Sequence, residues 1–191
     1  MMPQFGDSAH EVPATAVEDL FRLHYAAVAS YVRRRAPAES VDDVVAETFV
    51  VAWRRLERVP ADAALPWLLA VARNLIATQR RGAMRREALY LRLRRTTPPA
   101  AEQPPSAEEP VGPVASALAR LSEKDREALT LIAWDGLRPH EAAVVLGDLP
   151  TTFRARLHRA KRRLRRLLDD QEEQSSQSPS PRVMEAKESL R

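Results

Sequence analysis

Hydrophobic residues recur at steps of three and four along most of this chain, which is the spacing of an amphipathic helix. Alternating apolar and polar runs typical of strands are almost absent, and the chain has only 5 Gly. We therefore expect an all-α protein. The predicted helices cover about 15–35, 41–59 and 66–81, the last continuing toward 95, and then 114–121, 123–135, 139–146 and 151–168.

Three helix starts are also marked by a hydroxyl residue with an acidic residue three positions later, the spacing of a capping box. These pairs begin at Thr15, Ser40 and Ser122. Thr151 or Thr152 is expected to cap the last helix by accepting its unpaired backbone N–H groups.

A change in composition divides the chain into two parts. Residues 96–116 contain six prolines and no aromatic residue, so we expect a semi-stiff linker without a core. The linker separates a helical domain over 15–95 from a second one over 117–168. Residues 1–14 are expected to form a loose arm, and the polar residues 169–191 a largely disordered tail.

A strongly basic helix is predicted over 151–168, where no acidic residue occurs. Before it, Pro139 suits a helix start and Gly147 a helix stop, so a short helix precedes the basic one across a tight turn. This is the pattern of a helix-turn-helix, whose second helix enters the major groove of DNA. A basic face alone is also compatible with a solvated surface, an RNA or membrane contact or a partner site.

The first domain offers two further polar faces. On the second helix, Asp43, Glu47 and Arg54 share one side; the acids could be specific contacts or could merely complement the helix dipole. On the third helix, the outer side combines arginines with amide side chains, a composition suited to single-stranded nucleic acid. Trp53 and Trp67 are expected to lie in the core.

Composition excludes several classes of function. The chain carries 30 Lys and Arg against 26 Asp and Glu, a net charge of +4 with a pI near 9.9, so clustered arginine points to a polyanionic partner. There are no cysteines, no Gly-rich phosphate loop and only four scattered histidines, so we expect no enzyme, metal or organic cofactor. No secretory leader or membrane-length apolar run is evident, which predicts a cytoplasmic protein without membrane insertion.

Taken in order, these segments resemble the extracytoplasmic-function (ECF) sigma factors of bacterial RNA polymerase. The runs DLFRLHYAAVASYVRRR, DDVVAETFVVAWRRL and PWLLAVARNLIATQRR are similar to the family's promoter-melting domain. The runs LARLSEKDREALTLIAWDGL, EAAVVLG and TTFRARLHRAKRRL are similar to its upstream-promoter domain. The resemblance implies a protein that binds core polymerase, through the clamp helices of the largest subunit and the flap, and directs promoter-specific initiation. It also implies an anti-sigma factor as a further partner.

The resemblance assigns three sets of residues by position. It implies polymerase binding by Asp43, Glu47, Phe49, Trp53 and Arg54. It implies −10 element recognition by the loop over 57–64 and by Arg73, Asn74, Ile76, Arg80 and Arg81. It implies −35 element recognition by Thr152, Arg154, Ala155, Arg156, His158, Arg159 and Lys161.

This chain departs from the family pattern at the turn, where Asp148, Leu149 and Pro150 replace the usual residues, and at Arg138, where a Ser or Thr cap is common. The departures leave the identity of the −35 sequence open. The alternative function is a helix-turn-helix regulator that binds DNA and never joins polymerase. A membrane-binding role is disfavoured because the basic helices lack a large exposed apolar face.

Overall fold

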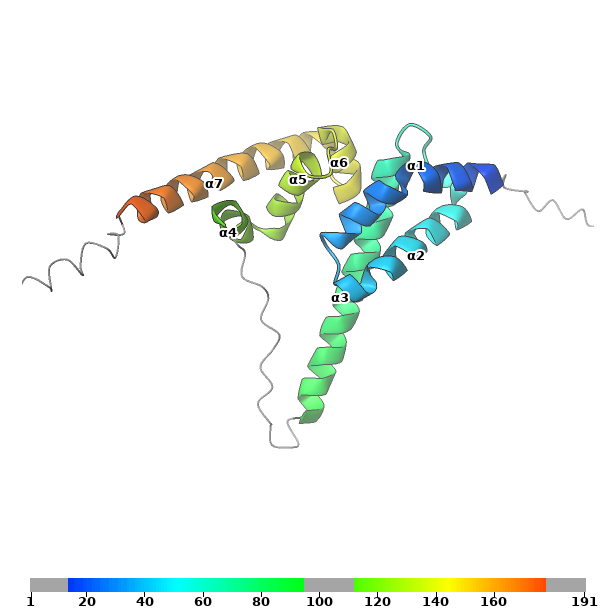
Figure 1. The fold of residues 1–191 in the computed structure, drawn as a ribbon, viewed down its shortest axis with the longest axis horizontal. Helices are drawn as coiled ribbons and strands as arrows, with labels where there is room; N and C mark the ends of the chain where they lie inside the picture. Colours follow the sequence, from blue (N-terminus) through cyan, green and yellow to red (C-terminus); the bar gives the residue numbers. More distant parts are fainter. Residues whose placement is uncertain (1–13, 95–111, 178–191) are drawn as a thin grey trace, which may run out of the picture. The chain divides into compact units, whose positions relative to one another are not determined.

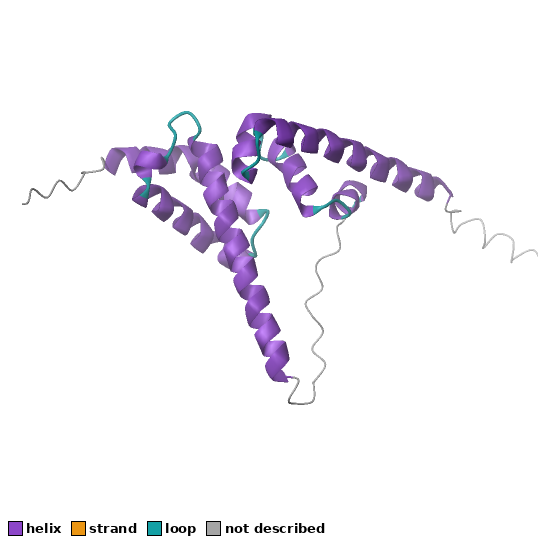
Figure 2. Cartoon of the chain, turned by 180° about the vertical axis from the view of Figure 1, so that it is seen from behind, coloured by secondary structure: helices purple, strands orange, loops and turns teal. Residues whose placement is uncertain are grey.

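The computed structural model describes residues 14–94 and 112–177, and within these ranges the chain is helical with no strand (Figure 1, Figure 2). The prediction of an all-α protein is confirmed. The helices are α1 (Ala14–Arg33), η1 (Ala38–Ser40), α2 (Val41–Arg54), η2 (Leu56–Arg58), α3 (Ala64–Arg94), α4 (Pro113–Ala119), α5 (Glu123–Ala133), α6 (Pro139–Leu146) and α7 (Pro150–Gln177).

The chain forms two compact units, one built on α1, α2 and α3 and the other on α4, α5 and α7. The division into units groups residues 141–148, most of α6, with the first. The short turns on either side of α6 nevertheless connect it directly to α5 and α7.

In the first unit, α1, α2 and α3 each pack against the other two. Helical periodicity brings one apolar stripe of each helix inward, and Tyr31, Val44 and Leu68 are completely buried. Thr48, also completely buried, donates its hydroxyl to the carbonyl of Val44 at 2.7 Å, so the polar atom in this core is satisfied.

A hydrogen bond joins α3 to the end of α1 in this bundle. The Arg80 guanidinium donates to the carbonyl of Arg35 at 2.8 Å. The Arg35 guanidinium lies 3.8 Å from the centre of the Tyr31 ring, a cation–π contact. Arg80 therefore satisfies a carbonyl just beyond the C-terminus of α1, where helices leave acceptors unpaired.

In the second unit, α7 is the longest helix and both α4 and α5 pack against it. Two views agree that α4 lies further toward the C-terminal end of α7 than α5 does (Figure 1, Figure 2). Leu131 and Phe153 are completely buried, and Leu121 is nearly so. The predicted apolar stripe of α7 is confirmed at Phe153, Leu157 and Ala160, which are buried.

Helix α6 ends in a glycine turn that leads directly into α7. Gly147 has φ of 67°, the left-handed conformation that only glycine adopts without strain. The N–H groups of Gly147 and Asp148 donate to the carbonyls of Val144 at 3.1 Å and Ala143 at 3.0 Å, the bond pair of a Schellman motif. This confirms the helix stop that was predicted at Gly147.

Several predicted boundaries and caps need correction. Ser122 accepts a hydrogen bond from the Asp125 N–H at 3.2 Å as predicted, but Ser40 makes no side-chain cap. Helix α7 begins at Pro150 and its first backbone bond is accepted by Leu149, so the threonines lie inside the first turn rather than at the cap.

Two helices extend beyond their predicted bounds. α4 begins at Pro113, inside the predicted linker, because proline is well suited to the first turn of a helix. α7 continues to Gln177, which takes helix into the predicted tail. Residues 1–13 of the predicted arm, residues 96–111 of the predicted linker and residues 178–191 of the predicted tail lie outside the described residues.

Candidate nucleic-acid and polymerase interfaces

Helix α7 presents its basic residues on the side opposite its buried stripe. Six of the seven residues predicted to bind the −35 element are exposed. Arg156 alone is half-buried, and its side chain already interacts with another group of the protein. The six exposed residues are Thr152, Arg154, Ala155, His158, Arg159 and Lys161.

The charges along α7 run against its helix dipole. Arginines fill its N-terminal half, where the dipole favours anions, whereas Asp169, Asp170, Glu172 and Glu173 follow toward the C-terminal half, where it favours cations. Helix stability therefore does not explain the charge order. A polyanion bound at the N-terminal half would compensate the unfavourable positive charge there, as at the N-terminus of a recognition helix.

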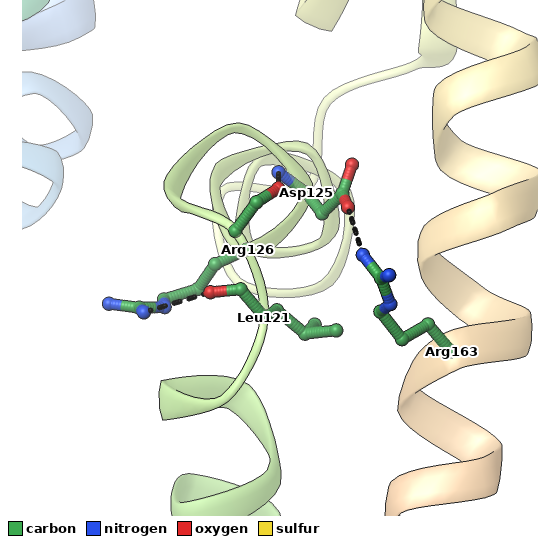
Figure 3. Close-up of polar contacts among 5 residues, drawn as sticks. Leu121, Asp125, Arg126 and Arg163 are labelled. Atoms are coloured by element: carbon green, nitrogen blue, oxygen red, sulfur yellow. Dashed lines mark hydrogen bonds and ion pairs between the residues drawn. The ribbon is translucent and has the colours of Figure 1, made fainter.

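Polar contacts from α5 brace α7 and α4 (Figure 3). Asp125 pairs with Arg163 of α7 at 3.6 Å. The neighbouring Arg126 donates to the carbonyls of Leu118 at 2.9 Å, Ala119 at 2.9 Å and Leu121 at 3.2 Å, at the end of α4. The sequence analysis identified Asp125 only as part of a capping pair, and no spacing in the sequence indicates these contacts between helices.

The predicted −10 face of α3 is divided between exposed and internal residues. Asn74 and Arg81 are exposed, and Arg73 is half-buried with a further interaction. Ile76 is only 5% exposed and belongs to the core, so it does not lie on the exposed face with Asn74 and Arg81. Arg80 is exposed but holds the end of α1 through the carbonyl of Arg35.

A chain of hydrogen bonds orders the exposed part of this face. Arg81 donates to the hydroxyl of Thr78 at 3.0 Å, and that hydroxyl donates to the carbonyl of Asn74 at 2.8 Å. The guanidinium of Arg81 is therefore held on the same side of α3 as Asn74, before any partner binds.

On α2, the residues predicted to bind polymerase also include both exposed and buried side chains. Asp43, Glu47 and Arg54 are exposed. Trp53 is 58% exposed, which contradicts the prediction that it lies in the core. Phe49 is only 7% exposed and so cannot offer its ring to a partner directly.

Phe49 instead supports an aromatic cluster that the sequence analysis missed. Its ring centre lies 4.9 Å from that of Phe21 and 6.4 Å from that of Tyr25, both on α1. Phe21 is 45% exposed and Tyr25 43% exposed. The two residues are one helical turn apart in the sequence, which indicates a shared face, but their hydrophobicity does not show that this face is exposed.

The described residues offer no group of three or more side chains that could hold a metal ion. In the same ranges no helix has both the length and the hydrophobicity that crossing a membrane requires. His24 is half-buried in α1, and this burial lowers its pKa below the usual 6.5 because it disfavours the charged imidazolium.

A three-helix bundle with a polar outer face on α3, followed in the chain by a helix-turn-helix with a basic second helix, is the arrangement of a sigma-type transcription factor. The family model for Sigma-70 region 2 matches residues 20–86, and that for Sigma-70 region 4 matches residues 112–164. The first model covers most of α1 to α3 and the second runs from α4 into α7, in the order predicted from the sequence.

Individual relatives are consistent with these matches. The chain is 34% identical over 167 residues to the ECF RNA polymerase sigma factor SigL of Mycobacterium tuberculosis, covering 82% of this chain and 91% of SigL. It is 33% identical over 144 residues to the RNA polymerase sigma factor CnrH of Cupriavidus metallidurans, covering 70% of this chain and 75% of CnrH. The solved structure of CnrH in complex with the cytosolic domain of CnrY matches with a TM-score of 0.53 and 30% identity, over 82% of this chain and 89% of CnrH.

The chain belongs to the ECF family of RNA polymerase sigma factors. The resemblance stated from the sequence motifs is thereby confirmed, and the protein acts in transcription initiation. Which individual residues can make the contacts depends on the geometry described above.

Proposed function

We propose that this chain joins core RNA polymerase and directs it to promoters by reading a −35 element with α7 and a −10 element with α3. The observation that carries the proposal is the exposed basic side of α7, placed directly after a Schellman turn in the segment that matches region 4. A helix presented in this way can enter the major groove, where base edges are distinguishable.

Within α7, exposure divides the proposed roles. Arg154, His158 and Arg159 lie near the N-terminal end and are exposed, so they are proposed to reach bases. An arginine forked onto guanine contributes about 1–3 kcal/mol of discrimination. Lys161 is proposed to contact phosphate, which adds affinity without sequence preference. Arg156 is half-buried and is proposed to position the helix rather than to read a base.

Within α3, the proposed −10 contacts are Asn74 and Arg81, with Arg73 beside them. Ile76 and Arg80 are proposed to stabilise this face without contacting DNA. Ile76 lies in the core, and Arg80 binds the end of α1. The loop around residues 57–64, which directly precedes α3, is proposed to receive a base that leaves the duplex. Extruding a base costs a few kcal/mol of stacking, so a pocket is needed to compensate.

The polymerase-docking face is proposed to comprise Asp43, Glu47 and Arg54 with the exposed Trp53. An exposed tryptophan beside charged residues is typical of an interface centre, where aromatic residues and arginine contribute most of the binding energy. The aromatic cluster of Phe21, Tyr25 and Phe49 is not assigned to this face. The proposed docking partners on the polymerase are the clamp helices of the largest subunit for α2 and the flap for the second unit.

The remaining proposals concern partners and place of action. CnrH was solved bound to the cytosolic domain of CnrY, and by analogy this chain is proposed to bind an anti-sigma factor. The protein is proposed to have no catalytic activity of its own and to act in the cytoplasm, at the nucleoid through its polymerase.

The decisive test is reconstitution with core RNA polymerase from the source organism, followed by run-off transcription on fragments of its genome. We expect the chain to co-purify with core enzyme and to yield transcripts from specific start sites. A protein that binds duplex DNA but neither core enzyme nor start sites would instead be a regulator that acts apart from polymerase. A chain that fails in all three measurements would refute both functions.

A further inference from the structure

The C-terminal part of α3 extends well beyond the three-helix core. The last buried residue of α3 is Ile76, and the helix continues from there for about five turns to Arg94. Within the first unit, this segment of α3, green in Figure 1 and purple in Figure 2, projects past α1 and α2 in both views. Every residue whose burial is described between Ala83 and Arg92 is exposed.

Three arginines of this segment line up with the proposed −10 face. Arg81, Arg85 and Arg92 follow Asn74 by seven, eleven and eighteen residues. At about 3.6 residues per turn these separations are close to two, three and five whole turns, so all four side chains leave α3 on one side. All four are exposed, and we call Arg81, Arg85 and Arg92 the arginine stripe.

Neither helix stability nor pairing along the helix explains the arginine stripe. Arg81 and Arg85 are four residues apart, and like charges at this spacing destabilise a helix by about 0.2–0.5 kcal/mol. The helix dipole favours cations only in the last turn, which excludes Arg81 and Arg85. Glu87 follows Asn74 by thirteen residues, about three and a half turns, and so lies on the opposite side of α3.

The apolar residues of the segment do not form a competing docking face. Met84, Leu89, Tyr90 and Leu91 are all more than half exposed. At helical spacing, Met84 and Leu91 share one side, while Leu89 and Tyr90 leave the helix in two other directions. A lipid surface or a partner helix needs a continuous apolar stripe, which the described part of this segment lacks.

We propose that the arginine stripe binds the sugar–phosphate backbone of promoter DNA, adding a sequence-independent contact to the −10 face. This inference rests on the proposed function. From Arg81 to Arg92 the stripe is about 17 Å long, and one DNA strand presents about five phosphates over that length of duplex. The hydrogen-bonded chain from Arg81 through Thr78 to Asn74 joins the stripe to the −10 face.

The test compares neighbouring arginines in the holoenzyme. Arg85→Gln removes one charge from the stripe, whereas Arg86→Gln removes the same charge from an exposed residue one position further along, on another side of the helix. Binding of each holoenzyme to a promoter duplex is measured by fluorescence anisotropy between 50 and 200 mM salt. Losing one phosphate contact should reduce the slope of log affinity against log salt by about 0.9.

We expect Arg85→Gln and Arg92→Gln each to reduce the slope by this amount, and the Arg86→Gln holoenzyme to keep the wild-type slope. Equal reductions for Arg85→Gln and Arg86→Gln would overturn the inference, because only general charge would then matter. Weaker binding of Arg85→Gln to core polymerase, with an unchanged DNA slope, would overturn it in favour of a polymerase contact. With either of these results, a wild-type holoenzyme that still initiates transcription at promoters leaves the proposed function intact. A wild-type chain that never joins core enzyme refutes both the proposed function and the inference about the arginine stripe.

Discussion

Replacing Arg126 by alanine tests how α4 is held in the second unit. One guanidinium donates three hydrogen bonds, to the carbonyls of Leu118, Ala119 and Leu121. The bond to Leu121 is drawn in Figure 3. The bonds to Leu118 and Leu121 are partly buried and the bond to Ala119 is exposed. Partly buried bonds from a charged donor contribute about 1–1.5 kcal/mol each and the exposed one little, so Arg126→Ala should cost about 2–3 kcal/mol.

The measurement is urea unfolding followed by tryptophan fluorescence. Trp134 lies directly after α5, whereas Trp53 and Trp67 lie in the first unit, so a background of Trp53→Phe and Trp67→Phe reports on the second unit alone. For a unit of this size, with an m-value of about 1 kcal/mol per molar urea, the midpoint should fall by about 2–3 M.

Lys124→Ala is the matched control, because Lys124 is an exposed cation on the same helix. Removing a cation from the first turn of α5 should change the free energy of unfolding by no more than a few tenths of a kcal/mol. If Arg126→Ala unfolds at the same urea concentration as this control, the three hydrogen bonds do not stabilise the second unit and the reasoning is wrong.

Three further predictions concern the first unit and the two interfaces. Burial lowers the pKa of His24, so the folded state binds its proton less readily than the unfolded state, and the stability this contributes is complete above pH 6.5 and lost as the pH falls below that value. Urea unfolding of the wild type should show this loss, and His24→Gln should remove that part of the pH dependence. Exchanging both Asp43 and Glu47 for Lys should reverse the charge of the docking face and weaken binding to core polymerase at least tenfold, measured by surface plasmon resonance. Arg159→Ala should cost about 1–3 kcal/mol at the preferred −35 sequence and reduce the preference for it over altered sequences in a competition assay.

Matched variants control the two interface predictions. Exchanging both Glu18 and Asp19, exposed acids of α1, for Lys makes the same change in charge outside the docking face and should leave polymerase affinity nearly unchanged. Arg166→Ala removes an exposed arginine two turns beyond Arg159 and should weaken DNA binding without altering sequence preference. If a control variant has the same effect as the interface variant to which it is matched, the proposed face is wrong. A stability of the first unit that does not change between pH 7 and pH 5 would contradict the burial of His24.

The helices and their buried sides could be predicted from the sequence because both follow from local periodicity. Phe153, Leu157 and Ala160 are buried as the helical spacing required. Gly147 marked the end of α6 because its backbone conformation excludes most other residues. These features depend on interactions within a few residues, which a sequence displays directly.

The errors arose where contacts between distant residues decide the outcome. Trp53 was assigned to the core by its hydrophobicity, but hydrophobicity does not distinguish a core residue from one that an interface requires. Arg80 binds a carbonyl 45 residues away, a contact that no periodicity reveals. The polar residues after Leu168 were expected to be disordered apart from fraying helix at their start, yet α7 continues to Gln177, because half-buried Leu164 and Gln171 lie along its packed side. Tertiary packing, rather than intrinsic propensity, stabilises most helices.

The way α4 and α5 share α7 limits how this protein can change over evolutionary time. A single inserted residue between the two contact regions would turn one of them about 100° relative to the other and shift it by about 1.5 Å. Insertions and deletions there would therefore disrupt the packing, whereas exchanges on the outer side of α7 leave it untouched. New promoter preferences can consequently arise through side-chain replacement alone, on a helix whose register is fixed by its contacts with α4 and α5.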